Sequence, residues 1–492
     1  MSYHLRILAI DLGTSRVKVG LIDEKLVTVA SSSHSYPTLT GEVGQAEQNP
    51  AEWLSAIHAS VRTIIDSEPT EHIDVVVLTA QMPTLVALSA SGLVMGNAIT
   101  WQDSRADSLV EAQLDESARR RVKELAGTPI DGRYVIPMHV LRNSNESYEP
   151  ATLLSAKDYL FYEFTGERVT DPSTASGFGN FDLASGGWSE ELTSLWGITA
   201  SLLPRVVDSH FTAPLSRSGA TIVPGIAPGT PVMVGAADSV CAHHFINALF
   251  ENSLSVIDGS STVIMATIND AASFVEDVLV TPLVDATRRG AEMDLLATGS
   301  SIAWLANVLG LTAAQLEELA INHPRRSGND VVFLPYLAGG EQGAIWRSDI
   351  SGSINGLTLS ASREDLALAL YEGIAIETVR CIEVLRSTQN VTNVVSVAAP
   401  DSRHFGASLL ASLLDVPVVA LAQQSPSLVG AARIALEQMT DVTLGLESFD
   451  SSILGSLPRL ELDYLASFKL KANRYLDMAA QPQTNPSRRD QA

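Results

Sequence analysis

The pattern of apolar and polar residues at the start of the chain predicts two strands joined by a tight turn. Mostly apolar segments run from Leu5 to Ile10 and again from Val17 to Ile22, and the mostly polar segment Asp11–Ser15 lies between them. Apolar runs of this length, bounded by Asp, Gly and Ser, are typical of strands that meet at a turn. An amphipathic helix is expected from about Pro50 to Ile65, because apolar residues recur there at helical spacing and proline suits a first helical turn.

The uncharged stretch from Val75 to Trp101 predicts strands and a turn. It is longer than the roughly 20 residues that a membrane-spanning helix needs, but Gln81 and Pro83 interrupt its apolar pattern. Residues Val75–Leu78 are typical of a buried strand, and Ser91–Gly92 at the centre is typical of a hairpin turn. We therefore expect part of a sheet in a globular protein.

Helical spacing predicts most of the remaining elements, and glycine and serine mark the loops between them. We expect an extended polar run at Ser31–Gln48, a loop at Ser173–Gly187 and a strand at Val394–Ala398. The expected helices are Leu109–Ala126, Ala151–Tyr162, Ser300–Leu309, Ala314–Ile321, Arg363–Leu385 and Phe405–Leu414.

The strand, acidic turn and second strand of the N-terminus recur half a chain later. The segment Leu254–Met265 repeats the order of Leu8–Ser15, with Asp, Gly and hydroxyl residues after an apolar run. Two copies at this separation suit two related halves. We expect an N-terminal domain of residues 1–250, a C-terminal domain of residues 251–480 and a disordered tail of residues 481–492, which is rich in Gln, Asn, Pro and Arg.

Charge and cysteine content narrow the class of protein. The 492 residues include 56 acidic and 32 basic side chains, and the net charge of −24 argues against nucleic acid or an anionic membrane as a partner. The two cysteines, Cys241 and Cys381, suit a reducing compartment. The apolar run Ile7–Ile10 is shorter than the core of a signal peptide, so we expect a cytoplasmic protein.

The first turn carries residue types that can hold a nucleotide phosphate. Neither the Gly-x-x-x-x-Gly-Lys-Ser/Thr loop nor a complete Gly-x-Gly-x-x-Gly after a strand occurs in the sequence. In the turn Asp11–Lys18, glycine permits close backbone approach, hydroxyls and amides can donate to phosphate, and Asp11 can hold Mg²⁺ through water. One such turn is ordinary hairpin chemistry. Its recurrence at Asp258–Thr262 predicts a phosphate clamp made of two hairpins.

Further motifs follow one another in the order and spacing of one protein family. They are Gly44–Trp53, Trp101–Arg105, Lys157–Leu160, Thr170–Ser176, Pro228–Asp238, Thr298–Leu305, Leu334–Gly339, Gly352–Leu357 and Tyr371–Gly373. Each is weak alone, whereas their shared order is specific. From about Leu5 to Thr440 the chain resembles the FGGY carbohydrate kinases, the family of glycerol, xylulose, ribulose and gluconate kinases.

The resemblance implies an α/β fold with two ribonuclease-H-like domains of the actin-like ATPase type and a cleft between them. It also implies transfer of the γ-phosphoryl group of ATP, with Mg²⁺, to a sugar or polyol hydroxyl. Asp238 is the implied catalytic base, because it follows the apolar strand Val232–Gly235, where a carboxylate can accept the proton of the hydroxyl. Without the family context, an Asp at this place would be interpreted as a helix N-cap.

The family pattern implies the remaining site residues by position. Asp11 is implied both at the metal and at the nucleotide phosphates. The other residues implied at the nucleotide are Gly13, Thr14, Ser15, Lys18, Gly259, Ser260, Gly299, Ser300, Ala399 and Ser402. The residues implied at the sugar are Gln81, Met82, Trp101 and Asp103. Trp101 suits stacking on a sugar, and a place in the core suits it nearly as well.

Two departures from the family pattern bear on the sugar and on ATP. Glycerol kinases place an Arg-Glu pair, and xylulose kinases usually a Met-His pair, where this chain has Met82–Pro83. Val397–Pro400 replaces a glycine-rich segment, and its side chains would crowd the adenine base. Because Met82 is present and the Arg-Glu pair is missing, we expect a ketopentose such as D-xylulose. Ribulose, gluconate and glycerol stay open as substrates.

Two other functions stay open from the sequence. A metal hydrolase would use Asp238, Cys241, His243 and His244, although their spacing matches no zinc motif. A non-catalytic regulator of the same fold, binding a sugar or nucleotide, would explain the altered segment before the last helix. The joint presence of the phosphate residues and of Asp238 argues for catalysis. The sequence does not decide the oligomeric state, for which a homodimer is one option.

Overall fold

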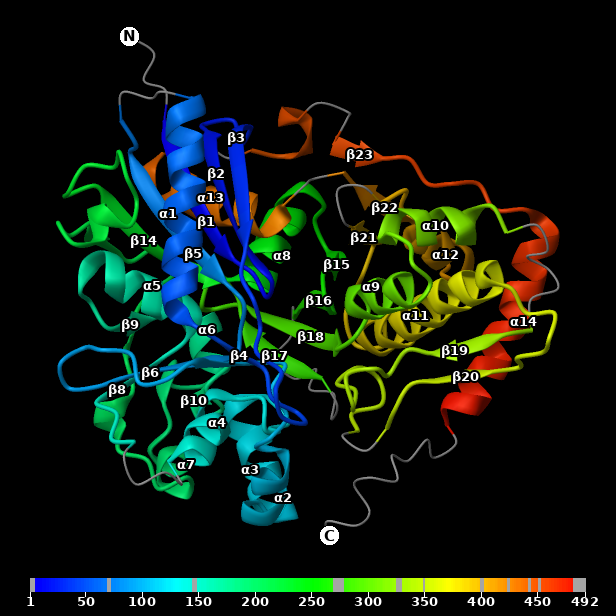
Figure 1. Cartoon of the computed structure of the whole chain (residues 1–492), viewed down its shortest axis with the longest axis horizontal. Coiled ribbons are helices and arrows are strands. Elements are labelled where there is room, and N and C mark those ends of the chain that lie inside the picture. Colours follow the sequence, from blue (N-terminus) through cyan, green and yellow to red (C-terminus); the bar gives the residue numbers. More distant parts are fainter. Residues whose placement is uncertain are drawn as a thin grey trace. The chain divides into compact units, whose positions relative to one another are not determined.

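The computed structural model describes residues 5–68, 72–143, 148–268, 278–323, 330–347, 350–398, 402–422, 425–440, 444–449 and 453–480. The chain forms two compact units, labelled by element in Figure 1. The first unit comprises Met1–Ala248, Leu279–Gly290 and Ser425–Ser448, and the second comprises Leu249–Val278, Ala291–Gln424 and Phe449–Ala492. Two segments from beyond residue 250 thus belong to the first unit. The domain boundaries expected from the sequence stay a prediction, and residues 481–492 lie outside the described part.

The first unit is built on a mixed sheet with the strand order β13-β14-β5-β1-β2-β3. β1 is antiparallel to β2 and parallel to β5, and β5 is parallel to β14. β1, β5 and β14 are almost wholly buried, as is usual for parallel strands covered on both faces. The bounds are β1 Arg6–Leu12, β2 Arg16–Asp23, β3 Thr28–Ser35, β5 Val75–Ala80, β13 Thr212–Pro214 and β14 Pro231–Ala237.

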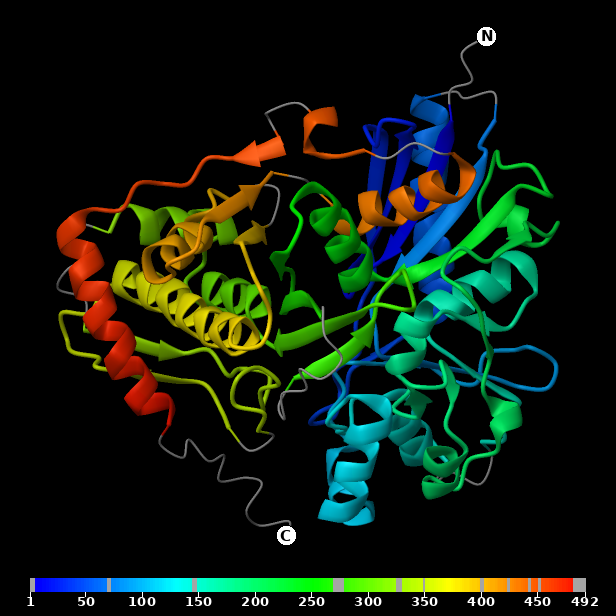
Figure 2. The ribbon, with the colours of Figure 1, turned by 180° about the vertical axis from the view of Figure 1, so that it is seen from behind.

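Helices cover both faces of this sheet. α1 (Pro50–Ser67) packs against β2 and β3, and α13 (Pro426–Met439) packs against β1 and β5. Figures 1 and 2 show α1 and α13 on opposite faces of the strands. The side chain of Asn49 accepts a hydrogen bond from the amide of Ala51, and Pro50 occupies the first turn of α1. The N-terminal strands therefore lie between an early helix and a helix that is distant in the sequence.

A second sheet of the first unit has the strand order β4-β7-β6-β8, and the short pairs β9–β12 and β10–β11 accompany it. The strands are β4 Glu47–Gln48, β6 Thr84–Leu88, β7 Ala98–Thr100, β8 Thr152–Leu154, β9 Val169–Thr170, β10 Phe181–Asp182, β11 Gly187–Trp188 and β12 Arg205–Val206. The residues of β17, Leu279–Pro282, also belong to the first unit, but β17 is part of neither this sheet nor these pairs. The helices are α2 Asp107–Gln113, α3 Glu116–Ala126, α4 Val135–Arg142, α5 Ala156–Thr165, α6 Pro172–Ser176, α7 Glu190–Leu195 and α8 Asp238–Leu249.

The second unit contains the strand order β18-β16-β15-β21-β22-β23. β15 is antiparallel to β16 and parallel to β21, which repeats the relation of β1 to β2 and β5. The strands are β15 Ser253–Asp258, β16 Thr262–Ile268, β18 Arg289–Leu295, β19 Val332–Leu334, β20 Ser353–Asn355, β21 Asn393–Val397, β22 Val418–Leu421 and β23 Leu454–Gly455. The helices are α9 Gly299–Val308, α10 Ala313–Ile321, α11 Arg363–Arg386, α12 Phe405–Leu413 and α14 Leu462–Ala479.

Most strongly periodic segments form the expected elements to within a few residues. The helices expected at Pro50, Ser300, Ala314, Arg363 and Phe405 are α1, α9, α10, α11 and α12. Both predicted strand–turn–strand segments are antiparallel pairs, β1–β2 and β15–β16. The turn at Ser91–Gly92 joins β6 to β7, which pair antiparallel.

Three expectations were wrong. The helix expected at Leu109–Ala126 is two helices, because Asp115 caps a new start by accepting from the amide of Ala118. The helix expected from Ala151 begins only at Ala156, since Thr152–Leu154 pairs with β6 as a strand. The segment expected as a loop, Ser173–Gly187, contains most of α6 and all of β10. The loop was expected because the segment is rich in glycine and serine.

A membrane-spanning helix needs sufficient length and apolar character. None of the helices among the described residues is both long and apolar enough to cross a bilayer.

Candidate active site

Three parallel strands end at one edge of the first sheet and place candidate residues there. The last residues of β1, β5 and β14 pair side by side. Asp11 is the last residue but one of β1, Gln81 directly follows β5, and Asp238 directly follows β14. The carboxyl ends of parallel strands are where α/β proteins bind their ligands. The edge therefore brings together a metal candidate, a sugar candidate and the base candidate.

The turn between β1 and β2 is held by two side chains, Tyr36 and Gln48. The hydroxyl of Tyr36 donates to the carbonyl of Gly13, and its backbone amide donates to the carbonyl of Ser15 at 3.2 Å. Nε2 of Gln48 donates to the carbonyl of Thr14 at 2.7 Å. Three successive carbonyls are thus bonded within the protein, which restricts the conformation of the turn. Thr14 is half-buried and Ser15 is exposed, so a ligand can reach the turn.

Asp11 has a carboxylate oxygen that lacks a partner. Oδ2 accepts a hydrogen bond from the hydroxyl of Ser427 at 2.7 Å and lies 3.8 Å from Nζ of Lys18. Oδ1 is buried without a hydrogen-bond partner among the described residues. Such an oxygen is costly to bury alone, and carboxylate oxygen is a ligand that Mg²⁺ prefers, directly or through water. The residues present therefore fit a magnesium complex.

Asp238 begins α8 and is half-buried. Its Oδ1 accepts a hydrogen bond from the amide of Ser239 at 2.8 Å, which is a local contact of a helix start. Burial, followed by the charges of Asp11 and Asp238, raises the pKa of Tyr36 far above its usual value. Both carboxylates therefore act on one phenol, which stays protonated and can keep donating to the turn.

A buried ion cluster supports β14, the strand that directly precedes the candidate base Asp238. Nζ of Lys157 lies 3.0 Å from a carboxylate oxygen of Asp158 and 3.0 Å from one of Asp171, and each of the three side chains is at most 1% exposed. Burial acts to lower the pKa of Lys157, but the two carboxylates outweigh it and raise the pKa. The hydroxyl of Ser173 donates to Asp171 and accepts from the amide of Ala237 at 3.0 Å. The end of β14 is thereby tied to the cluster.

Two of the four sugar candidates, Gln81 and Trp101, contact the first turn or a residue that supports it. Nε2 of Gln81 donates to Oε1 of Gln48 at 3.0 Å, while Oε1 of Gln81 is buried without a partner among the described residues. Met82 is half-buried and precedes a cis peptide bond to proline. Nε1 of Trp101 donates to the hydroxyl of Thr14 at 3.2 Å, and its ring is half-buried. The structure thus places Trp101 beside the turn.

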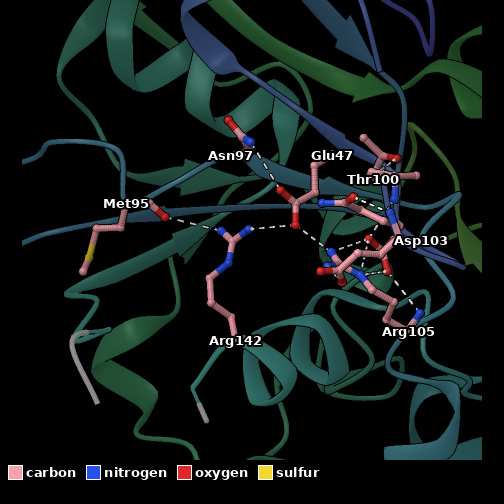
Figure 3. Close-up of polar contacts among 10 residues, drawn as sticks. Glu47, Met95, Asn97, Thr100, Asp103, Arg105 and Arg142 are labelled. Carbon is pink, nitrogen blue, oxygen red and sulfur yellow. Dashed lines mark hydrogen bonds and ion pairs between the residues drawn. The ribbon is translucent and has the colours of Figure 1, made fainter. Parts of the chain in front are cut away.

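The fourth sugar candidate, Asp103, is engaged in an ion-pair network (Figure 3). Its side chain is 1% exposed, and Oδ2 accepts from Arg105 at 2.7 Å and from the amide of Ala46 at 2.9 Å. Arg105 also lies 2.6 Å from Glu47, which Arg142 approaches at 3.9 Å. Burial acts to raise the pKa of Glu47, but its hydrogen bonds and the two arginines lower it below the usual value. Asp103 shapes this loop, and its contact with a sugar stays a prediction.

In the second unit, the β15–β16 turn packs closely on the start of α9. The carbonyl of Ser260 accepts from the amides of Thr298 and Ser300 at 3.3 and 3.0 Å and from the hydroxyl of Ser300 at 3.0 Å. A Cβ atom on Gly299 would lie 2.0 Å from the carbonyl oxygen of Gly259, so only glycine fits there. The structure brings these four nucleotide candidates, Gly259, Ser260, Gly299 and Ser300, into one contact.

The remaining nucleotide candidates lie after β21. The hydroxyl of Ser402 donates to Oε1 of Glu317 at 3.0 Å, and the amides of Arg403 and Phe405 donate to the same carboxylate. Glu317 thereby caps the start of α12, where an anion is favourable. Ser402 has this structural contact, and its place at a nucleotide stays a prediction. Ala399 lies outside the described residues.

Comparison with known families decides the class of protein. Residues 6–244 match the N-terminal domain of the FGGY family of carbohydrate kinases, and residues 254–439 match the C-terminal domain of that family. The chain belongs to the FGGY family of carbohydrate kinases. The family resemblance and the enzyme class predicted from the sequence are confirmed, and kinases of this family use ATP.

Relatives of this FGGY kinase carry different substrate names. The gluconokinase of Bacillus subtilis is 26% identical over 475 residues, covering 92% of this chain and 91% of the relative. The xylulose kinase of Staphylococcus xylosus is 24% identical over 436 residues, covering 87% and 90%. Among solved structures, a ligand-bound xylulose kinase from Lactobacillus acidophilus has a TM-score of 0.82 and 23% identity, covering 97% of this chain and 99% of that one. That likeness confirms the predicted fold class.

The sequence did not reveal the part that four residues of this FGGY kinase play in the candidate site. They are Tyr36, Gln48, Ser173 and Ser427. Gln48 and Ser173 lie within motifs that carry the family resemblance, and this was the available signal. Tyr36 lies in a polar run without pattern, and Ser427 bonds a residue 416 positions away. Contacts at that separation leave no trace in local periodicity.

The alternative metal site of the FGGY kinase does not assemble as a cluster. His244 bonds Glu437 at 2.9 Å. Burial lowers the pKa of His243 to about 3 and raises that of Cys241 to about 12, so that both are neutral at pH 7. Within the described ranges, no three His, Cys, Asp or Glu side chains are grouped so that they could hold a metal ion.

Proposed function

We propose that this kinase transfers the γ-phosphoryl group of ATP to a hydroxyl of a small sugar, with Asp238 as the general base. One observation supports this most strongly: Asp11 near the end of β1 and Asp238 directly after β14 lie at the same edge of the sheet, with β5 between the two strands, and the charges of both raise the pKa of Tyr36. A carboxylate for the metal complex and a carboxylate for the proton are the two groups that phosphoryl transfer to an alcohol requires.

In the proposed reaction, Asp238 accepts the proton of the sugar hydroxyl while the hydroxyl oxygen bonds to the γ-phosphorus. The bond between that phosphorus and the bridging oxygen of ADP breaks, and ADP leaves with the electron pair. The hydrogen bond from the amide of Ser239 orients the carboxylate of Asp238 at the start of α8. Asp238 is half-buried, so it is held in place yet accessible.

The residues of the two turns are proposed as the nucleotide site. Thr14, Ser15 and Lys18 would contact phosphate oxygens from the first turn, and Asp11 would hold Mg²⁺ through its unpaired Oδ1. Magnesium supplies neutralisation of the phosphate charge when it is bound. Gly259, Ser260, Gly299 and Ser300 of the second unit, together with Ala399 and Ser402, are proposed for the rest of the nucleotide.

For the sugar we propose a ketopentose such as D-xylulose, held by Gln81, Met82, Trp101 and Asp103. Met82 and the absence of an Arg-Glu pair in the sequence support this, and relatives named xylulose kinase share the fold. Gluconate is the second candidate, because a relative named gluconokinase aligns over 92% of the chain.

A coupled ADP-release assay tests the function and chooses the sugar. Purified protein with MgATP is offered D-xylulose, D-ribulose, D-gluconate and glycerol separately. We expect the highest kcat/KM with D-xylulose. A higher value with gluconate would replace the ketopentose proposal, and no sugar-dependent ADP from any compound would reject the kinase function.

The Asp238→Asn variant tests the base. Removing a general base lowers a rate by about 10²–10⁴-fold, so kcat is expected to fall in this range, while calorimetry still detects MgATP binding. Asp66→Asn removes the same charge at a residue that is 61% exposed and should keep wild-type kcat. An active Asp238→Asn enzyme would show that another group takes the proton.

A further inference from the structure

Gln48 is a fully buried amide whose side chain uses its complete hydrogen-bonding capacity. It is 0% exposed. Oε1 accepts from Nε1 of Trp53 and from Nε2 of Gln81, each at 3.0 Å. Nε2 donates to the carbonyl of Thr14 at 2.7 Å and to the hydroxyl of Thr38 at 2.8 Å. Two donors and two acceptor positions are all that an amide side chain offers.

The chemistry of the partners sets which way this amide points. An indole nitrogen can only donate, so the atom facing Trp53 has to be the oxygen of Gln48. A backbone carbonyl can only accept, so the atom facing Thr14 has to be the nitrogen. Both ends of Gln48 require the same orientation, and a flipped amide would lose the bonds to both partners.

The orientation of Gln48 in turn sets that of Gln81. Because Oε1 of Gln48 is an acceptor, Gln81 must present its amide nitrogen to it. Oε1 of Gln81 therefore points away from Gln48, and this oxygen is the one that is buried without a partner among the described residues. It offers an acceptor to a donor such as a sugar hydroxyl at the edge of the sheet where Asp238 lies.

We propose that Gln48 is a positioning residue that couples the phosphate-binding turn to the sugar-binding Gln81, an inference that rests on the proposed function. One end of Gln48 holds the carbonyl of Thr14 on the phosphate side. The other end presents Gln81 on the sugar side. This gives a physical role to the motif Gly44–Trp53, since Gln48 and its partner Trp53 both belong to it.

Two variants of Gln48 test the coupling. Gln48→Asn keeps an amide but is one methylene shorter, so it cannot reach Thr14 and Gln81 together. Gln48→Met fills a similar volume without hydrogen bonds. Each is expected to raise the KM of ATP and the KM of the sugar by about tenfold, which corresponds to the loss of a buried hydrogen bond at each end.

Matched variants separate coupling from simple support of the core. Thr38→Val removes one hydrogen bond of the same amide but neither link, so both KM values should stay within about twofold of wild type while stability falls. Gln81→Met cuts the sugar link alone and should raise only the KM of the sugar. Urea unfolding of each variant reports stability separately from KM.

The outcomes distinguish this inference from the proposed function. Folded Gln48 variants with wild-type KM values would reject the coupling and leave the kinase function intact. If neither Gln48 variant folds, Gln81→Met decides, because an unchanged KM for the sugar would also reject the coupling. A wild-type protein without sugar-dependent turnover would reject the function itself. In that case, calorimetry with a non-hydrolysable MgATP analogue still tests the inference. Binding of the analogue by Gln48→Asn with the affinity of wild type would reject the coupling.

Discussion

At the scale of single residues, burial of an ionisable side chain changes its pKa, and Glu341 is an example. Glu341 is 4% exposed, and its Oε1 accepts from the amides of Leu296 and Gln342 at 3.1 and 2.8 Å. Burial, with a smaller effect of the charge of Glu377, raises its pKa from 4.5 to about 8 despite these bonds. A carboxyl group of this kind makes folding stability depend on pH.

The sign of that dependence follows from proton binding. Between pH 4.5 and about 8 the folded protein keeps a proton on Glu341 that the unfolded chain has lost, so stability falls as pH rises through this window. Below pH 4.5 both states are protonated and stability is not reduced. The slope is about 1.4 kcal/mol per pH unit for one group.

Glu341→Gln removes this titration, so its unfolding free energy should change less between pH 5 and 8 than that of wild type. Urea unfolding at several pH values measures the difference. Glu318→Gln, at a residue 52% exposed, should keep the wild-type slope. Parallel pH profiles for Glu341→Gln and wild type would show that Glu341 is ionised in the folded protein throughout.

At the scale of elements, α13 supports the site because it packs closely on its neighbours. A Cβ atom at Gly430 would lie 1.9 Å from the carbonyl oxygen of Cys241 in α8. α8 starts with Asp238, and α13 carries Ser427, which bonds Asp11. The two helices thus hold the two carboxylates of the site, and glycine sets how closely the helices approach.

Gly430→Ala is expected to destabilise the protein by about 1–3 kcal/mol, since a methyl group against a backbone carbonyl forces the helices apart. It should also lower kcat by displacing Ser427. Gly406→Ala in α12 meets nothing within 4 Å and should stabilise by up to about 1 kcal/mol through helix propensity. Equal unfolding midpoints for both variants would contradict the close packing of α13.

At the scale of the whole molecule, the net charge of −24 opposes the binding of ATP, so positive charge has to act locally. Lys18 lies across the β1–β2 pair from Asp11, with its Nζ 3.8 Å from Oδ2, and is 42% exposed. Lys25 is exposed in the turn at the other end of β2. The two lysines contribute equally to the net charge and differ only in place.

Lys18→Met and Lys25→Met separate local from global charge. Lys18→Met should raise the KM of MgATP by about tenfold, because the proposed charge-assisted hydrogen bond from Lys18 to phosphate would be lost. Lys25→Met should leave the KM within about twofold. Equal effects in the ADP-release assay would mean that the overall field, and not the first turn, governs nucleotide binding.

Much of the fold could be predicted where one face of an element is apolar. α1 shows this periodicity, because its buried residues recur at helical spacing. The first strands of the two strand–turn–strand segments were predicted from nearly continuous apolar runs, which are buried along most of their length. The break at Asp115 and the strand at Thr152–Leu154 could not be predicted. The first is a single capping bond within a helical pattern, and the second depends on pairing with β6.

The sequence by itself determined the family and the repeated turn, because these depend on residue types in order along the chain. Asp238 as the base is what the family resemblance implies, and it stays a prediction. Only the tertiary structure decided that Gln48 links Thr14 to Gln81, that Ser427 bonds Asp11, and that Asp103 is engaged by Arg105. Hydrogen bonds depend on distance and direction in space. Both are set by how distant segments pack, as where the chain returns to the first unit after about 400 residues. The local sequence around each residue therefore does not predict these bonds.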